Sequence, residues 1–202
     1  MTTRRPNIVL FVADHYRGDV LAHVGNPAAV TPNLDGVVST DGVSFRNAFC
    51  QAGVCTPSRC SFMSGWYPHV AGHRTMHHML HEHEPVLLRT LKESGYTVWW
   101  GGKNDLVPAQ KVSKRDEPWG PYCDIRHTGQ GAKRWKAMRD REVDFRGQPG
   151  GDTYYSFFVG RLDTEGEQFY HDTDWDCVLA AVDFIRSRPA EPFCLYLCLG
   201  FP

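Results

Sequence analysis

The amino-acid sequence predicts an α/β fold in which a mostly parallel sheet is flanked by helices. Short apolar runs at residues 7–12, 96–100 and 193–199 have the composition of strands that are buried on both faces of such a sheet. Between them, apolar residues recur at helical spacing in segments 84–94 and 174–188. Because strands and helices that alternate along a chain typically form a parallel sheet, the pattern indicates an α/β domain.

The first strand, at 7–12, ends directly before Asp14 and His15. Ligands collect at the carboxyl ends of strands in open α/β sheets, so both residues are candidates for a functional site. Farther along the chain, Thr31 and Pro32 predict the start of a helix. Thr31 has the character of an N-cap, and Pro32 suits the first helical position.

The remaining segments are less regular. Residues 42–49 predict a second strand, and residues 55–59 predict a turn that leads into a short helix at 60–64. Proline, glycine and charged residues are dense across 108–171, which predicts a loop-rich excursion. Within that excursion, only 154–160 has the composition of a strand.

Charge and hydropathy exclude several classes of partner. A net charge of -1 over 202 residues gives no electrostatic reason to expect nucleic acid or an anionic membrane. No apolar run reaches the roughly 20 residues that a membrane span needs. Two arginines precede the first apolar run, as in a signal peptide, but Asp14 and His15 cut that run short. We therefore expect a cytoplasmic protein with no nucleic-acid or membrane partner.

The cysteines do not form a disulfide pattern. Their number, 7, is odd, and their spacing does not suggest a framework of bridges. Cys194 and Cys198 lie in an apolar run and are expected to be reduced core residues. Cys55 and Cys60 differ from them because they flank a polar segment that contains a proline. The chain has no C-x-x-C pair, so a structural zinc site built on thiolates is not expected.

Residues 55–65 fit the signature C-x-P-S-R-x-x-x-[apolar]-[ST]-G at every specified position. In this window the chain resembles the formylglycine-dependent sulfatases, a family of the alkaline phosphatase-like superfamily. The resemblance implies that a maturation enzyme oxidises Cys55 to formylglycine, and that the hydrated aldehyde attacks the sulfur of a sulfate ester. An isolated C-x-P would be an ordinary cysteine in a turn, but the complete signature disfavours that alternative.

Simple physical chemistry supports a catalytic role for this segment. A gem-diol can release its ester by hemiacetal-type collapse, so no separate attack of water on sulfur is needed. Pro57 fixes the backbone, while Ser58 and Arg59 open a helix whose N-terminal dipole favours an anion. The guanidinium of Arg59, with its fork of donors, is suited to holding the diol oxygen and shaping the site.

The resemblance also implies a divalent cation, with Ca²⁺ as the first choice and Mg²⁺ or Mn²⁺ as alternatives. Asp14 stands where the family places its first metal-binding carboxylate, and Cys55 contributes in its matured form. His15 departs from the Asp-Asp or Asp-Gln pair that is usual there. Imidazole ligates divalent metals but favours softer ions than calcium, which leaves the identity of the metal open. The predicted metal ligands are therefore Asp14, His15 and Cys55.

The strand at 96–100 is followed by a segment that resembles the family's Gly-Lys-x-His sequence. The resemblance makes Lys103 a catalytic residue that contacts the sulfate, and its compact charge suits a tetrahedral anion. Asn104 is a second candidate donor to the substrate. The family's histidine is replaced by Asp105, whose carboxylate would repel an anionic ester unless it binds a cation or points away. Asp105 is therefore not expected to inherit the histidine's role.

Two further clusters of polar residues have ordinary interpretations. Six histidines crowd into a short segment: His69, His73, His77, His78, His81 and His83. The spacing of His77 and His81 is that of a metal pair on a helix, but the H-E-x-x-H arrangement is missing, so surface or substrate-pocket histidines are favoured. A group of three acidic residues is predicted to lie at a helix N-terminus, namely Asp172, Asp174 and Asp176.

The resemblance is strongest over 6–106 and 172–202, and it implies that a complete sulfatase is roughly twice this length or more. We therefore expect residues 1–202 to be the N-terminal part of a catalytic domain that lacks further metal ligands and is inactive alone. The leading hypothesis is a sulfuric ester hydrolase acting on a small molecule or a sugar. A phosphonate or phosphate monoester hydrolase of the same superfamily and a non-catalytic remnant are the alternatives, and the oligomeric state stays open.

Overall fold

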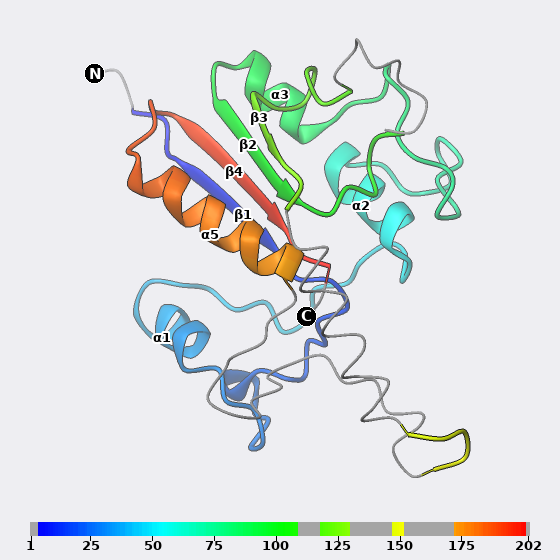
Figure 1. Cartoon of the computed structure of the whole chain (residues 1–202), viewed down its shortest axis with the longest axis vertical. Coiled ribbons are helices and arrows are strands. Elements are labelled where there is room, and N and C mark those ends of the chain that lie inside the picture. The colour runs from blue at the N-terminus through cyan, green and yellow to red at the C-terminus, as the bar shows by residue number, and fades with distance from the viewer. Residues whose placement is uncertain (1–3, 109–117, 130–146, 152–171, 201–202) are drawn as a thin grey trace.

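The computed structural model describes residues 4–108, 118–129, 147–151 and 172–200. In these residues, four parallel strands form one sheet with the order β1-β4-β2-β3 (Figure 1). The strands are β1 (Ile8–Val12), β2 (Thr97–Gly102), β3 (Ile125–His127) and β4 (Phe193–Cys198). The helices are η1 (Ala22–Val24), α1 (Pro32–Thr40), α2 (Cys55–Ser64), α3 (Leu87–Glu93) and α5 (Asp172–Arg186), of which η1 is a 3-10 helix.

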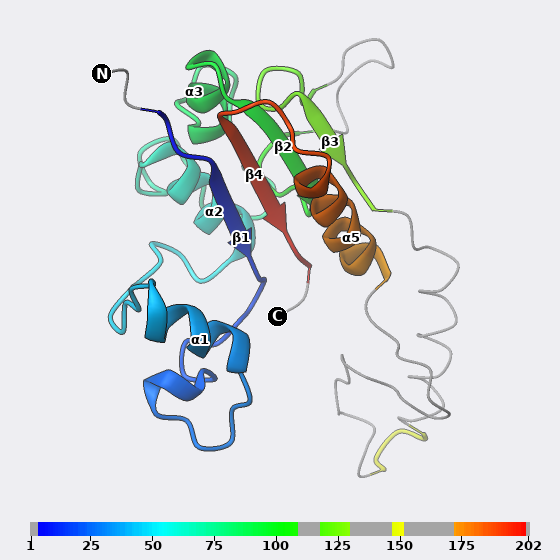
Figure 2. The ribbon, with the colours of Figure 1, turned by 90° about the vertical axis from the view of Figure 1, so that its left-hand side faces the viewer.

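Helices cover both faces of the sheet. Figure 2 shows α5 on one face, with α2 and α3 on the other. Side chains alternate between the faces, so that neighbouring tryptophans of β2 serve different cores. Trp100 packs with Val98 and Tyr196 on the face of α2 and α3. Trp99 packs with Leu195 on the face of α5. Because helices cover both faces of the sheet, the central strand β4 is buried along its whole length, and its sequence is a continuous apolar run.

The carboxyl ends of the three longer strands lie in register. Val12 and Gly102 both pair with Cys198, which is the last residue of the central strand β4. The loops that follow β1 and β2 therefore leave the sheet at the same level, one on each side of β4. This alignment brings the segments after Val12 and after Gly102 to one edge of the sheet, as expected for parallel strands.

A small unit lies beyond the carboxyl end of β1, where η1 and α1 pack together (Figure 1). His23 joins its parts, because Nδ1 lies 2.8 Å from Oδ1 of Asp35 and Nε2 lies 2.9 Å from Oγ of Ser44. The hydroxyl of Thr31 accepts a hydrogen bond from the backbone N–H of Ala22 and donates to Asp35. Thr31 thus precedes α1 as predicted, but its hydroxyl does not cap the helix.

The structure confirms the predicted strands at 7–12, 96–100 and 193–199 and the helices near 84–94 and 174–188. The strand predicted at 42–49 is wrong. No neighbouring strand pairs with this segment among the described residues, and an extended run without a ladder partner is not a strand.

Three other differences concern short or local features. The helix predicted at 60–64 begins earlier, at Cys55, so residues 55–59 form its first turn. The edge strand β3 lies inside the segment 108–171, where only 154–160 was predicted as a strand; residues 154–160 lie outside the described part of the chain. Among the described residues, no helix has both the length and the apolar character that crossing a membrane requires.

Candidate active site

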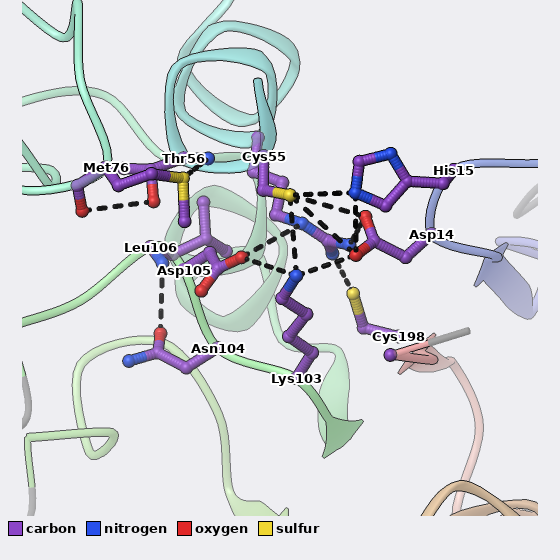
Figure 3. A network of polar contacts seen from close by, with 12 residues as sticks. Asp14, His15, Cys55, Thr56, Met76, Lys103, Asn104, Asp105, Leu106 and Cys198 are labelled. Carbon is purple, nitrogen blue, oxygen red and sulfur yellow. Dashed lines mark hydrogen bonds and ion pairs between the residues drawn. The ribbon is translucent and has the colours of Figure 1, made fainter. Parts of the chain in front are cut away.

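Three segments converge beside the carboxyl ends of β1 and β2 (Figure 3). Asp14 follows β1, Lys103 follows β2, and Cys55 is the first residue of α2. The Sγ atom of Cys55 lies 3.6 Å from Oδ1 of Asp14 and 3.4 Å from Nζ of Lys103. Residues that are far apart in the sequence thus surround one sulfur atom, and the predicted nucleophile lies next to two of its predicted partners.

The local sequence explains why α2 begins at Cys55. Val54 is extended, with φ -119° and ψ 141°, and its carbonyl accepts the first helical hydrogen bond, from Ser58 at 3.0 Å. Pro57 is tolerated in this first turn because the N–H groups there have no partner within the helix. Gly65 ends the helix with φ 74°, a left-handed conformation that glycine adopts readily. Cys55 therefore lies at the positive end of the helix dipole, which favours an anion.

Arg59 is buried beneath this cluster, with 3% of its surface exposed. Its Nη2 lies 3.1 Å from Oδ1 of Asp14, while Nη1 faces the Tyr196 hydroxyl at 3.5 Å and contacts Sγ of Cys198. No sequence motif predicted the contacts with Tyr196 and Cys198. The only indication of them was that Cys198 ends a buried strand, which is where site residues collect.

Lys103 and Asp14 form a direct ion pair, with 2.7 Å between Nζ and Oδ2. Burial acts to raise the pKa of Asp14, but the hydrogen bonds and charges of Lys103 and Arg59 outweigh it and hold that pKa below its ordinary value. Burial likewise acts to lower the pKa of Lys103, yet Asp14 and Asp105 raise it above its ordinary value. At neutral pH the site therefore contains a carboxylate and an ammonium group.

Asp105 points into the cluster. Its Oδ2 lies 3.0 Å from Nζ of Lys103 and 3.8 Å from Nε of Arg59. The 3.0 Å contact with Lys103 is an ion pair. Oδ2 of Asp105 is buried and has no well-aligned hydrogen-bond donor among the described residues. The carboxylate that replaces the family's histidine thus binds two cations.

Asp14, His15 and Cys55 could hold a metal ion. Their donor atoms lie within 4.8 Å of one another, and no other group of three His, Cys, Asp or Glu donors in the described ranges is as compact. His15 has a left-handed backbone with φ 54°, and its Nε2 lies 3.7 Å from Sγ of Cys55. A carboxylate, an imidazole and a third donor fit a divalent cation.

A cleft of about 300 Å³ opens beside these residues, and a larger hollow of about 560 Å³ adjoins it. Cys50, Ser58 and Phe62 line both spaces, so the two lie next to each other along one side of α2. Trp66 and Tyr67 add partly exposed aromatic rings to the larger hollow. The arrangement leaves room for a bulky group next to Cys55.

The structure does not bring Asn104 into the cluster. Its amide donates to the carbonyl of Val107 at 2.6 Å, and its Oδ1 accepts from the backbone N–H groups of Leu106 and Val107, each at 3.0 Å. The side chain thus shapes the loop after β2 and points away from Cys55 in Figure 3. A contact between Asn104 and substrate stays a prediction that this geometry does not favour.

The histidines of the segment after α2 do not share one role. His73 is a core residue with 3% exposure: its Nδ1 lies 2.6 Å from the carbonyl of His78, and its Nε2 lies 2.7 Å from Oε2 of buried Glu84. The expectation of a surface or pocket position is therefore wrong for His73. His77 and His81 are both exposed and lie in loops. Their spacing is therefore not that of a pair on a helix.

Comparison with known proteins gives a consistent result. A family profile described as Sulfatase matches residues 6–200. Arylsulfatase K of Danio rerio is 28% identical over 206 residues, which cover 98% of this chain and 34% of that protein. The chain thus spans about a third of the length of this curated relative.

Solved structures share the fold. The phosphonate monoester hydrolase of Agrobacterium radiobacter matches with a TM-score of 0.62 and 22% identity, covering 97% of this chain and 41% of that one. A protein whose structure was solved in complex with its substrate D-glucosamine-2-N,6-O-disulfate matches with a TM-score of 0.64 and 19% identity, covering 97% of this chain and 34% of that one. At these identities the matches confirm the predicted α/β fold of the superfamily and nothing finer.

Proposed function

The chain belongs to the sulfatase family, and from this membership we propose that it carries the nucleophile of a site that hydrolyses sulfuric esters. One observation carries the proposal. The signature cysteine, Cys55, starts a helix and has Nζ of Lys103 at 3.4 Å and Oδ1 of Asp14 at 3.6 Å. A residue placed between a cation and a candidate metal ligand is suited to attack an anionic ester.

The proposed nucleophile is the hydrate of formylglycine, which a maturation enzyme forms from Cys55. One hydroxyl of the hydrate attacks sulfur, and the bond between sulfur and the ester oxygen breaks. The attacking hydroxyl gives up its proton and the departing ester oxygen takes up a proton, so that the leaving group departs as the alcohol. Loss of the proton from the second hydroxyl then collapses the sulfated hemiacetal, which expels sulfate and restores the aldehyde, and water hydrates it again.

Other residues of the chain orient and neutralise the reacting groups. Lys103 has its ammonium beside residue 55, where it would contact a sulfate oxygen and offset the charge of the ester. Arg59 holds Asp14 through a 3.1 Å contact and so fixes the carboxylate next to the nucleophile. A divalent cation bound by Asp14, His15 and matured residue 55 would supply further charge neutralisation. Ca²⁺ is our first choice and Mg²⁺ or Mn²⁺ are the alternatives; the imidazole of His15 favours softer ions than calcium and leaves the identity of the metal open.

We propose a sulfate ester of a small molecule or a sugar as the substrate. The hollow that adjoins the cleft has aromatic side chains on its rim, and aromatic faces suit a ring-shaped leaving group. The structure of a protein of the same fold was solved in complex with a sulfated glucosamine as its substrate, which is compatible with this class.

Hydrolysis of a phosphonate or phosphate monoester is the second candidate. The fold is also that of a phosphonate monoester hydrolase, and His15 departs from the acidic pair that is usual in sulfatases. Both reactions would use the same nucleophile, and the rates on matched substrates would separate them. The third possibility, a non-catalytic remnant, requires Cys55 to stay unmodified.

The proposal is tested with the full polypeptide produced together with a formylglycine-generating enzyme. Peptide mass spectrometry should find an aldehyde or its hydrate at position 55, and matched aryl sulfate and aryl phosphonate esters should show which is turned over. Cys55→Ala, produced in the same way, is the matched control and should be inactive. Undiminished sulfatase activity of a protein that retains the plain thiol would refute the mechanism.

A further inference from the structure

The ammonium group of Lys103 lies between two carboxylates (Figure 3). Its Nζ is 2.7 Å from Oδ2 of Asp14 and 3.0 Å from Oδ2 of Asp105, on different sides of the site. Asp14 is a predicted metal ligand, whereas Asp105 does not belong to the compact donor group with His15 and Cys55. Lys103 thus has one partner inside the candidate metal site and one partner outside it.

Both carboxylate oxygens of Asp14 already contact a cationic side chain in this arrangement. Its Oδ1 accepts from Nη2 of Arg59 at 3.1 Å, and its Oδ2 accepts from Lys103 at 2.7 Å. Oδ2 is also the oxygen that faces His15, with 3.8 Å to Nε2. A divalent cation that uses Asp14 together with His15 would approach Oδ2, where it meets the ammonium group of Lys103, and two cations close to one oxygen repel each other.

The carboxylate of Asp105 is positioned to pair with the ammonium group of Lys103. Its backbone is left-handed, with φ 51°, and the bonds from Leu106 N–H and Val107 N–H to the Asn104 side chain, each 3.0 Å, fix the loop around it. Its Oδ2 is buried and lacks an aligned hydrogen-bond donor, so it has unused capacity at the atom that faces Lys103. A buried acceptor without a hydrogen-bond partner is stabilised when a cation approaches it.

From these contacts we propose that Asp105 is a positioning residue that takes Lys103 from Asp14 when a divalent cation binds. The inference rests on the metal site of the proposed function. Without a metal, Lys103 neutralises Asp14. With a metal, the ammonium group stays paired through Asp105 and remains beside residue 55, where a sulfate would lie. Asp105 acts through Lys103 and touches neither metal nor substrate.

Metal affinity measured without substrate tests this coupling. Calorimetric titration with Mn²⁺ or Ca²⁺ alone is carried out on the full protein and on Asp105→Asn, Lys103→Gln and the double variant. We expect Asp105→Asn to weaken metal binding by about tenfold, the lower end of what loss of an outer-shell partner costs. Lys103→Gln should bind more tightly than the wild type, since the competitor for Oδ2 is gone. The double variant should match Lys103→Gln, because Lys103, through which Asp105 acts on the metal site, is then absent.

A control separates this effect from a general change in charge. Asp19→Asn also removes one carboxylate, from an exposed ion pair with Arg17, and should leave metal affinity unchanged. Thermal unfolding without metal checks that each variant is folded.

Three results would overturn the inference. In the first, Asp105→Asn weakens metal affinity equally in the wild-type and Lys103→Gln backgrounds. In the second, Lys103→Gln binds metal no more tightly than the wild type. In the third, no variant binds metal. If the expected pattern appears but no sulfate ester is hydrolysed, the coupling holds and only the proposed function fails.

Discussion

The Nζ atom of Lys103 lies 2.7 Å from Oδ2 of Asp14, although 89 positions separate the two residues in sequence. They follow β2 and β1, which are not neighbours in the sheet, because β4 lies between them. The contact forms across the end of β4, where the Lys103 N–H donates to the carbonyl of Cys198 at 2.7 Å. The site is thus assembled over the end of a strand that supplies none of the predicted catalytic residues.

Replacement of Asp14 by asparagine should lower the free energy of unfolding at neutral pH by about 2 kcal/mol, the range for hydrogen bonds to charged groups. The folded-state pKa of Asp14 is held below its ordinary value of 3.8, so its contribution is fully present above that pH and is lost as pH falls through the folded pKa. Urea unfolding above and below pH 3.8 should show the gap between wild type and variant narrowing in acid. If the difference in free energy of unfolding between wild type and variant stays constant with pH, the ion pairs of Asp14 do not contribute to stability as proposed.

Gly102→Ala should destabilise the protein and displace Lys103. Gly102 has φ +82°, and an added Cβ would lie 1.9 Å from the carbonyl oxygen of Cys198, so the backbone must shift. We expect a loss of about 2–4 kcal/mol from combined overpacking and strain. Gly36→Ala is the control, because it lies in α1 with nothing within 4 Å of its added Cβ and should stabilise by about 0.5–1 kcal/mol. Equal effects of the two changes in thermal unfolding would refute the close contact.

Removal of one partner from the buried pair of His73 and Glu84 should be costly. His73 is 3% exposed and Glu84 is 0% exposed, and a lone buried charge costs about 3–5 kcal/mol. Urea titrations should therefore show a large loss in the free energy of unfolding for His73→Leu. The double variant His73→Leu with Glu84→Leu should show a smaller total loss, since no charge is then left buried. His77→Ala, at an exposed position, should change the free energy of unfolding by less than about 0.5 kcal/mol. A double variant that is worse than His73→Leu alone would argue against the pair.

Thiol labelling should distinguish the matured protein from the unmatured one. Cys50 is exposed and Cys55 is partly exposed, whereas burial raises the pKa of Cys60 to about 12 and that of Cys194 to about 11. With iodoacetamide at mildly alkaline pH, the native unmatured protein should be modified at Cys50 and Cys55, and the matured protein at Cys50 alone. Mass spectrometry of tryptic peptides would detect this, and denaturant should expose the remaining thiols. Labelling of Cys60 or Cys194 in the native protein would contradict their burial.

Much of the fold follows from local patterns in the sequence. The apolar runs of β1, β2 and β4 predicted buried parallel strands, because a strand covered on both faces needs apolar residues at successive positions. The same patterns placed Asp14 and Lys103 at strand ends, and parallel strands direct their carboxyl ends to one edge. The same reasoning missed the three-residue strand β3 and wrongly predicted a strand at 42–49. Whether such a short segment forms a strand depends on whether a neighbouring strand is available to pair with it.

Local sequence patterns were enough to predict β1, β2 and β4, the signature segment at 55–65 and the residue types that the proposed sulfate-binding site needs. Tertiary packing was required to place β4 between β1 and β2, to turn Asp105 toward Lys103, and to bury His73 against Glu84. The physical reason is that propensity and periodicity act over a few neighbouring residues, whereas these contacts join segments that meet only after the sheet has formed. Which carboxylate an ammonium group selects depends on distances that no local pattern encodes.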